Sequence, residues 1–279
     1  MLLAYSTVAI LPIARGAARG MAEGAMRSAD ALNADLDIVR EARILFGHQS
    51  VGADILEGIA ELTDQLHAAP LGIIAVTGPG VATPAGGFLA EVRIGSNGDP
   101  VSKFEAFRAA AGGAASRYDV VTMKLCYADF DAASDFARIF DGYRRLVAGV
   151  RAEPACPVVL HVTTPLQTVT AGWKMLVKTL LGRPQDVRNV ENLRRAEYNA
   201  LLRKTFSGEP LFDLAALESG VYPEAPSATA PDPGAPPALM SRYTRDGGHL
   251  NAEGRSVAAR GFIRALAGAV RAARRPTAA

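Results

Sequence analysis

The chain has 279 residues, of which 49% are hydrophobic and 21% are charged, and its formal net charge is +2. This composition is that of a globular protein with enough chain to bury a large core. Basic residues are not interleaved with aromatic residues in a stripe, so the sequence does not favour nucleic acid as a partner.

The chain begins with an apolar run, MLLAYSTVAILPIA, and Arg15 is its first basic residue. The run is shorter than a typical transmembrane helix and lacks the basic start of a typical secretion signal. Three interpretations stay open: a signal peptide or anchor, a segment at a membrane interface, and an N-terminal helix of the fold. We favour export or anchoring, with membrane association only through residues 1–14, and we treat 1–30 as an extension of one domain at 31–279.

The rest of the chain alternates between short apolar runs and helical patterns. The apolar runs predict strands near 43–47, 71–76, 92–95, 119–125, 157–162 and 211–214. Apolar residues at spacings of three and four predict helices over 52–66, from 103, over 136–150, 192–206 and 252–274. The segments 77–91, 167–189 and 221–245 are irregular and are expected to wall a cleft. This alternation predicts an α/β fold with a mainly parallel sheet and helices on both faces.

The two cysteines are expected to be free thiols. Cys126 should end one strand and Cys156 should precede another, which places them at opposite ends of neighbouring parallel strands. At ~3.3 Å per residue this separation is roughly 20 Å, whereas a disulfide needs Cα atoms within about 7 Å.

The stretch from Arg43 to Gly58, RILFGHQSVGADILEG, predicts a strand that turns sharply into a helix, with Ser50 on the turn. The start of a helix has unpaired N–H groups and the positive end of the dipole, which suit an oxygen that becomes negative. Ser50 is therefore a candidate nucleophile. Because serine is common at helix starts, it is alternatively only the N-cap.

Near the other end, Asp246-Gly-Gly-His249 supplies the groups that a nucleophilic serine needs. A carboxylate close to a histidine fixes its tautomer and stabilises the imidazolium, and the histidine activates the hydroxyl by taking its proton. Separately, His249 would be a capping or core residue and Asp246 a turn residue. Together with Ser50 they predict a Ser-His-Asp triad.

The order of GHQSVG, SNGDP and DGGHLNAEG resembles the SGNH/GDSL hydrolase superfamily, from about Arg43 to the last helix. The first block is similar to a branch that reads Gly-His-Gln-Ser-Val-Gly. The resemblance implies a three-layer, flavodoxin-like α/β/α sandwich. It also implies Ser50 as nucleophile, His249 as base and Asp246 as its partner, and the N–H groups of Ser50 and Gly98 as oxyanion donors.

One block departs from the family. The family ends its third block with an asparagine that donates to the oxyanion, whereas the matching strand here ends Lys124-Leu-Cys-Tyr-Ala-Asp129. Loss of one such donor costs roughly 2.7–4 kcal/mol of transition-state stabilisation. Asn97 and the phenol of Tyr127 are the candidate replacements. The alternatives are a turn asparagine and a core tyrosine.

Three further residues, His48, Gln49 and His161, are weaker candidates for substrate binding, and His48 is also suited to brace the turn. A metal site would need His48, His161 and His249 to meet at a carboxylate, and no ligand spacing supports one. We expect neither a metal nor a cofactor.

These features predict a serine ester hydrolase of the esterase, lipase or acetylesterase kind, acting on a small-molecule or glycan ester through an acyl-enzyme on Ser50. Two alternatives stay open. The same triad would serve an O-acyltransferase, and the missing asparagine is consistent with a non-catalytic, carbohydrate-binding module on a hydrolase-like fold.

Overall fold

A computed structural model describes residues 28–76, 84–112, 118–153, 157–169, 187–221 and 237–275. The predictions for residues 1–14, for Cys156 and for most of 167–189 and 221–245 lie outside these ranges. Cys126 lies inside them, and it is a buried free thiol.

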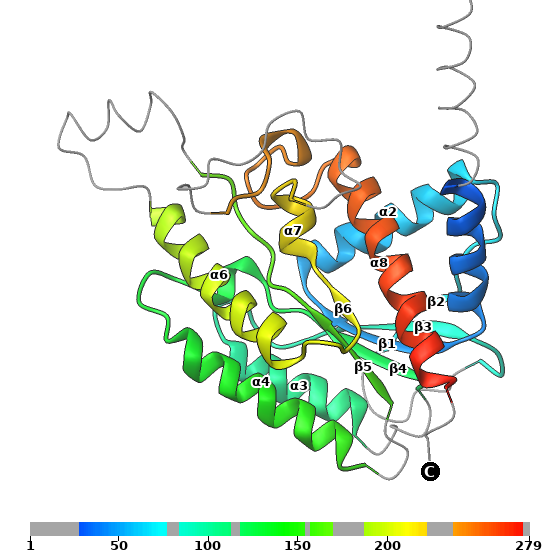
Figure 1. The fold of residues 1–279 in the computed structure, drawn as a ribbon, viewed down its shortest axis with the longest axis horizontal. Coiled ribbons are helices and arrows are strands. Elements are labelled where there is room, and N and C mark those ends of the chain that lie inside the picture. The colour runs from blue at the N-terminus through cyan, green and yellow to red at the C-terminus, as the bar shows by residue number, and fades with distance from the viewer. Residues whose placement is uncertain are drawn as a thin grey trace, which may run out of the picture.

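A parallel sheet of six strands forms the centre of the described structure, in the order β2-β3-β1-β4-β5-β6 (Figure 1). The strands are β1 (Arg43–His48), β2 (Ile73–Ala75), β3 (Phe88–Arg93), β4 (Val120–Met123), β5 (Val158–Val162) and β6 (Leu211–Phe212). β1 lies between β3 and β4 and is parallel to both. Because the chain continues to β2 and β3 on one side of β1 and to β4 on the other, the carboxyl end of β1 is the switch point, where open α/β sheets bind ligands.

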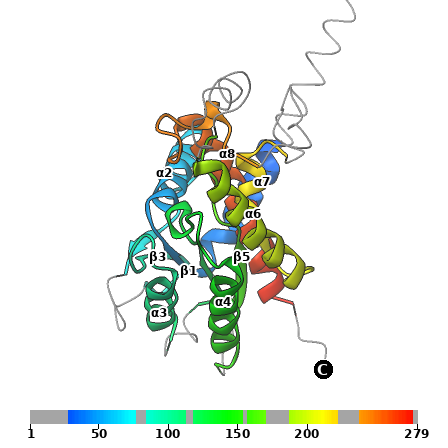
Figure 2. The ribbon, with the colours of Figure 1, turned by 90° about the vertical axis from the view of Figure 1, so that its left-hand side faces the viewer.

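Helices cover both faces of the sheet, so the predicted three-layer α/β/α fold is confirmed (Figures 1 and 2). One layer contains a helix over 28–40, α2 (Ser50–Gln65), α7 (Leu214–Glu218) and α8 (Ala252–Ala273); the other contains α3 (Pro100–Ala111), α4 (Phe136–Arg151) and α6 (Val187–Thr205). Two short 3-10 turns, η2 (Tyr127–Asp129) and η3 (Ser241–Tyr243), lie in the loops. Successive strand residues point to opposite faces, and accordingly Ile44 and Phe46 enter one core while Leu45 enters the other.

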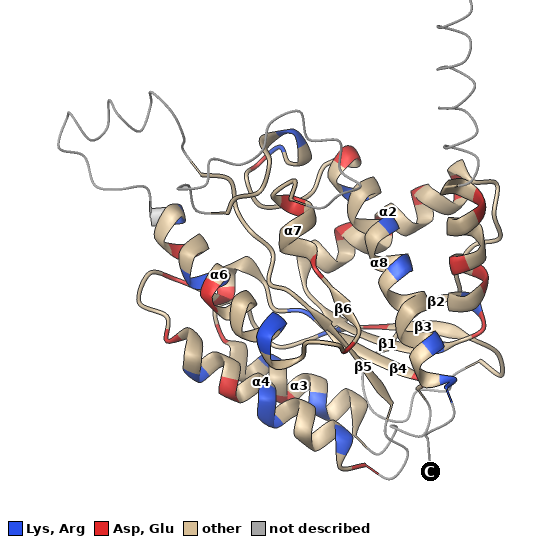
Figure 3. Cartoon of the chain, in the orientation of Figure 1, with Lys and Arg blue, Asp and Glu red and all other residues tan. Residues whose placement is uncertain are grey.

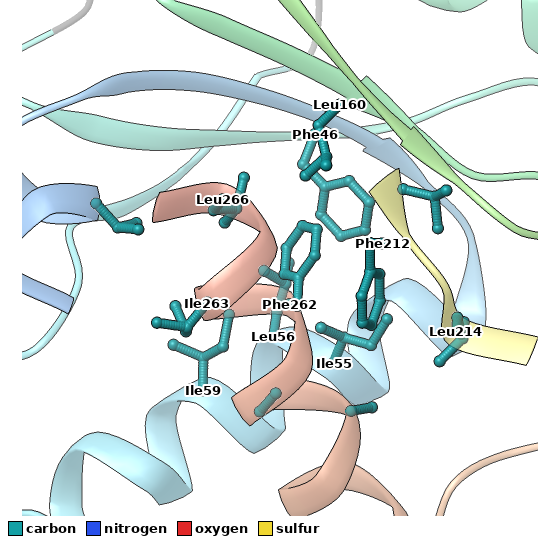
Figure 4. Packing of buried hydrophobic residues seen from close by; sticks show 14 of the residues in the cluster. Phe46, Ile55, Leu56, Ile59, Leu160, Phe212, Leu214, Phe262, Ile263 and Leu266 are labelled. Carbon is teal, nitrogen blue, oxygen red and sulfur yellow. The ribbon is translucent and has the colours of Figure 1, made fainter. Parts of the chain in front are cut away.

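The packing of α2 determines the direction in which its first residue points. Ile55 and Ile59 of α2 are buried in the same core as Phe46 of β1 and Phe262 of α8 (Figure 4). The Phe46 and Phe262 ring centroids are 4.9 Å apart. Burial of each such side chain contributes about 1.5–3 kcal/mol. This apolar stripe fixes the rotation of α2 about its axis and therefore the position of Ser50.

The structure differs from the sequence prediction at several boundaries. The strand β3 begins at Phe88, so the end of the segment 77–91 is not irregular. Its Glu91 breaks the apolar run in the sequence, but in the structure this carboxylate pairs with buried His48. The strand predicted at 211–214 is shorter and leads directly into α7, and α6 begins inside the segment 167–189. The helix over 28–40 was not predicted.

The outer helices carry acidic and basic side chains interspersed along their length (Figure 3). Within the ranges that the structure describes, no helix has both the length and the apolar character that crossing a bilayer requires.

Candidate active site

Ser50 is the first residue of α2, directly after the carboxyl end of β1. The N-cap is Gln49, so the interpretation of Ser50 as the cap is wrong. The turn between strand and helix is tight, because a side chain at Gly52 would come within 2.3 Å of the His48 Cβ. The Gly52 N–H donates to the Gln49 carbonyl at 2.9 Å. The Ser50 N–H precedes this bond and has no partner among the described residues, which leaves it available to a ligand.

The structure brings the three predicted triad residues together. Ser50 Oγ lies 3.0 Å from His249 Nε2, and His249 Nδ1 lies 2.5 Å from Asp246 Oδ2. The other carboxylate oxygen, Asp246 Oδ1, accepts the N–H groups of Gly248 and His249 at 2.9 and 2.8 Å. The hydrogen bond from His249 holds the pKa of Asp246 well below its usual range, and the two backbone N–H groups add to this effect. Asp246 is therefore ionised and fixes His249 as the Nδ1–H tautomer.

The three residues are accessible to solvent. The side chains of His249 and Asp246 are 41% and 55% exposed, and Ser50 is half-buried. A molecule in solution can therefore reach the hydroxyl of Ser50 and the ring of His249 at the same time.

Asp54 connects α2, the helix that begins at Ser50, to the loop that carries His249, here called the histidine loop. It was not predicted from the sequence. Its Oδ2 accepts the Leu250 N–H at 3.0 Å. Asp54 lies one turn after Ser50 on α2, so the i, i+4 spacing was the signal that would have found it. Burial raises the pKa of Asp54, and the bond from Leu250 opposes this effect. The bond fixes the residue next to His249 relative to Ser50.

The Gly98 N–H is not free to bind an oxyanion, which corrects the prediction. It donates to Asp129 Oδ1 at 3.0 Å. The Asp129 carboxylate also accepts the Cys126 N–H at 2.6 Å and lies 2.7 Å from Lys103 Nζ. The side chains of Lys103 and Asp129 are fully buried, and such a pair is held because separating it would leave an uncompensated buried charge. This network joins the loop after β3 to the loop after β4.

The two proposed replacements for the missing asparagine have different surroundings. The carboxamide oxygen of Asn97 accepts from Lys103 Nζ at 3.0 Å, and its Nδ2 has no partner among the described residues. The hydroxyl of Tyr127 lies 3.5 Å from His249 Nε2, and the two rings meet edge to face at a centroid distance of 5.9 Å. Tyr127 therefore contacts the triad, whereas Asn97 is oriented by a buried lysine beside Gly98.

His48 and Gln49 hold the turn. His48 is fully buried, so the prediction that it binds substrate is wrong, and the side-chain amide nitrogen of Gln49 is engaged by the turn. The ring of His48 is buried, with Nδ1 2.9 Å from the Gln49 carbonyl and Nε2 2.9 Å from a Glu91 oxygen. Burial lowers the pKa of His48. The side-chain amide of Gln49 donates to the carbonyls of Ile94 and Gly95 at 2.6 and 2.7 Å. The hydrogen bonds of both residues thus connect the end of β3 to the start of α2.

His161 lies in the core, so its predicted place in the cleft is also wrong. Its Nδ1 is 2.9 Å from the Tyr143 hydroxyl and its Nε2 is 3.0 Å from Glu209 Oε2. The ring stacks on Phe206 at 3.9 Å and is fully buried, which lowers its pKa. The metal alternative needed His48, His161 and His249 to meet, but each has a separate set of partners. In the described part of the chain no three metal-ligating side chains gather.

Arg195 of α6 holds the loop that carries Tyr127. Its Nε donates to the Tyr127 carbonyl at 3.0 Å, and its Nη2 donates to the Phe130 carbonyl at 3.3 Å and to Gln167 Oε1 at 2.9 Å. One turn away, Asn192 pairs with the backbone N–H and carbonyl of Gln167 at 3.1 and 2.7 Å. This polar face of α6 positions the loops after β4 and β5.

No protein-family model matches the chain, and no curated protein does. Solved structures do match. One from Slackia heliotrinireducens, assigned to the SGNH hydrolases, is 18% identical, with a TM-score of 0.46 over 81% of this chain and 98% of that one. A lipolytic protein of the G-D-S-L family from Desulfitobacterium hafniense is 11% identical, with a TM-score of 0.45 over 80% and 99%. A peptidoglycan O-acetylesterase is 10% identical, with a TM-score of 0.48 over 88% and 96%. The chain is thus similar to proteins whose names include the superfamily that its motifs resemble.

Proposed function

We propose that the chain is a serine ester hydrolase that acts through an acyl-enzyme on Ser50. The observation that carries this proposal is the continuous set of short contacts from Ser50 Oγ to His249 Nε2, at 3.0 Å, and from His249 Nδ1 to Asp246, at 2.5 Å. This is the arrangement in which a histidine can take a proton from a serine while a carboxylate stabilises the resulting imidazolium.

In the first step, Ser50 Oγ forms a bond to the ester carbonyl carbon and gives its proton to His249 Nε2. The carbonyl oxygen becomes an oxyanion. When the intermediate collapses, the bond from carbon to the alcohol oxygen breaks, and the proton on Nε2 passes to that oxygen. The products are a free alcohol and an acyl group on Ser50. Asp246 remains ionised throughout, because its pKa is held well below the usual range.

The oxyanion is stabilised in this proposal by the free Ser50 N–H, at the positive end of α2. The second donor is Asn97 rather than the engaged Gly98 N–H. The contact with Lys103 at 3.0 Å turns the amide oxygen of Asn97 inward, which leaves its NH₂ group as a donor. The side chain is exposed beside the position where the resemblance implies a donor.

In the second step, water gives a proton to His249 Nε2 and attacks the acyl carbon. When this second intermediate collapses, the bond from carbon to Ser50 Oγ breaks, His249 returns the proton to Oγ, and the acid leaves. The side chain of His249 is 41% exposed, which allows water to reach the histidine that activates it. The substrate class in this proposal is a small-molecule or glycan ester.

Labelling with a fluorophosphonate tests the proposal, because this probe reacts with an activated serine. We expect labelling of the wild type at Ser50, its loss in Ser50→Ala, and unchanged labelling in Ser134→Ala, a half-buried serine in the loop before α4 whose hydroxyl donates to Asp131. In parallel, the wild type should hydrolyse members of a panel of p-nitrophenyl esters and acetylated sugars, and Ser50→Ala should not. Absence of labelling in folded wild-type protein, or labelling that persists in Ser50→Ala, would contradict the proposal.

A further inference from the structure

Tyr127 is placed to act on a different oxygen from the one that the missing asparagine would bind. Resting on the proposed function, we infer that the Tyr127 hydroxyl donates a hydrogen bond to the leaving alcohol oxygen during acylation. The hydroxyl lies 3.5 Å from His249 Nε2, on the same nitrogen that Ser50 Oγ contacts at 3.0 Å.

The position of Nε2 distinguishes the leaving alcohol oxygen from the oxyanion in the tetrahedral intermediate. This nitrogen takes the proton from Ser50 and then delivers it to the leaving oxygen, so that oxygen must come within about 2.6–3.2 Å of Nε2. The Tyr127 hydroxyl lies 3.5 Å from the same nitrogen, which puts it within reach of a leaving oxygen that approaches Nε2 from the side of the phenol. The oxyanion is a different substituent of the same carbon, and it turns toward the Ser50 N–H at the start of α2.

The protonation states match this role. Burial raises the pKa of Tyr127, so its hydroxyl stays protonated and serves as a donor. Before the reaction, Nδ1–H is held by Asp246, and Nε2 can accept from either hydroxyl. Once Nε2 carries the Ser50 proton, it no longer accepts, and the Tyr127 O–H is released to the leaving oxygen. The proton that the alcohol finally gains comes from His249, and Tyr127 keeps its own.

The phenol is held in place from both sides. Arg195 Nε donates to the Tyr127 carbonyl at 3.0 Å, and the guanidinium lies 5.9 Å from the centre of the ring. On the other side the ring packs against Gly248, where an added Cβ would lie 2.8 Å from Tyr127 Cζ. Gly248 thus has a steric reason, since only glycine at this position admits the phenol so close to His249.

The test compares Tyr127→Phe with the wild type on acetate esters whose leaving groups range from p-nitrophenol through phenol to simple alcohols. A poor leaving group needs help from a hydrogen bond, and p-nitrophenolate does not. We expect kcat/KM to fall about tenfold or more for the alkyl acetates, and by less than about threefold for p-nitrophenyl acetate. Tyr243→Phe is the matched control, because that hydroxyl accepts from Arg242 in η3; it should leave the whole series unchanged.

Two outcomes would overturn the inference. An equal loss for every leaving group would show that Tyr127 binds the oxyanion, and no loss for any of them would show that it only packs. Fluorophosphonate labelling separates this failure from failure of the proposed function. If Tyr127→Phe is labelled at Ser50 like the wild type while the ester series is unchanged, only the inference about Tyr127 fails. If the wild type is not labelled, the proposed function fails.

Discussion

The molecule contains two histidines with almost the same hydrogen bonds. His249 has a carboxylate, Asp246, on one ring nitrogen and the hydroxyl of Ser50 on the other. His161 has a carboxylate, Glu209, on one nitrogen and the hydroxyl of Tyr143 on the other. Judged by donors and acceptors alone, both are carboxylate–histidine–hydroxyl sets.

Their environments differ. The side chain of His249 is 41% exposed and that of His161 is fully buried and stacked on Phe206. Burial raises the pKa of the Tyr143 phenol far above its usual value, so that hydroxyl does not give up its proton. The hydroxyl of Ser50 lies instead at the start of a helix, where charge on a bound oxygen is stabilised. The two histidines therefore differ in solvent exposure and in the nearby helix start, and not in their hydrogen-bond partners. These two properties distinguish a candidate catalytic histidine from a structural one.

The largest expected difference in kcat/KM and in the free energy of unfolding is between His249→Ala and His161→Ala. The first removes the proposed base, so kcat/KM should fall roughly 10⁴-fold or more with little change in stability. The second leaves the Tyr143 hydroxyl without its partner and opens a cavity, while Glu209 keeps its pair with Arg151. It should lower the free energy of unfolding by about 2–4 kcal/mol, with kcat/KM of the folded fraction within about threefold. Ester kinetics and denaturant unfolding of both variants measure this contrast, and a reversed pattern would contradict it.

The two carboxylates provide the next comparison. Asp246→Asn removes the acceptor that selects the Nδ1–H tautomer of His249, and we expect a loss of roughly 10⁴-fold in kcat. Glu209→Gln, at the buried histidine, should leave kcat within about twofold, because its partner does not reach the site. Steady-state kinetics on a p-nitrophenyl ester measure both. Similar activities for the two variants would mean that Asp246 does not orient the base.

A smaller effect is expected where Asp54 accepts the Leu250 N–H. Asp54→Ala frees the histidine loop from α2 and should lower kcat about tenfold with KM nearly unchanged, since a loosely placed base is less effective. Asp54→Asn keeps an acceptor oxygen at this position and should restore most of the activity. The separation of kcat from KM identifies a positioning role. Failure of Asn to rescue would assign the effect to the charge of Asp54 instead.

The smallest expected effect concerns pH and stability at His161. Burial lowers its pKa below the ordinary value of 6.5, so in acid the unfolded chain binds a proton that the folded protein does not. The stabilising contribution is present above that ordinary value and is lost as the pH falls below it. Between about pH 7.5 and about pH 5.5 the wild type should lose ~1 kcal/mol more unfolding free energy than His161→Gln. Equal slopes in urea titrations at the two pH values would contradict the buried, neutral state of His161.

The parts of the fold and site that sequence could predict are those with local signals. The strand, tight turn and helix around Ser50 follow from an apolar run, a glycine and a change to helical spacing. Asp246 and His249 lie three residues apart, so their contact needs only one loop. Both sets of residues meet because the carboxyl end of β1 lies at the centre of the sheet, which the alternation of elements makes the expected location of a site.

The predictions that were wrong concern residues whose contacts are determined by residues far away in the sequence. The Gly98 N–H is occupied because Lys103 and Asp129, 26 residues apart, form a buried pair, and no local pattern announces it. His161 lies one residue before the end of β5, and the alternation of side chains along the strand directs it to the face of α4 and α6. Its neighbours Leu160 and Val162 face α2 and α8. A position near a strand end is thus insufficient to predict that a side chain faces the cleft, since an offset of one residue moves the side chain to the other face of the sheet.

The most direct test of the central claim is the location of the acyl group. Wild-type protein mixed with p-nitrophenyl acetate, quenched in acid and mapped by peptide mass spectrometry, should carry an acetyl group on Ser50, and Ser50→Ala should carry none at that peptide. An acetyl group that accumulates on another residue, or hydrolysis by Ser50→Ala at the wild-type rate, would contradict the account.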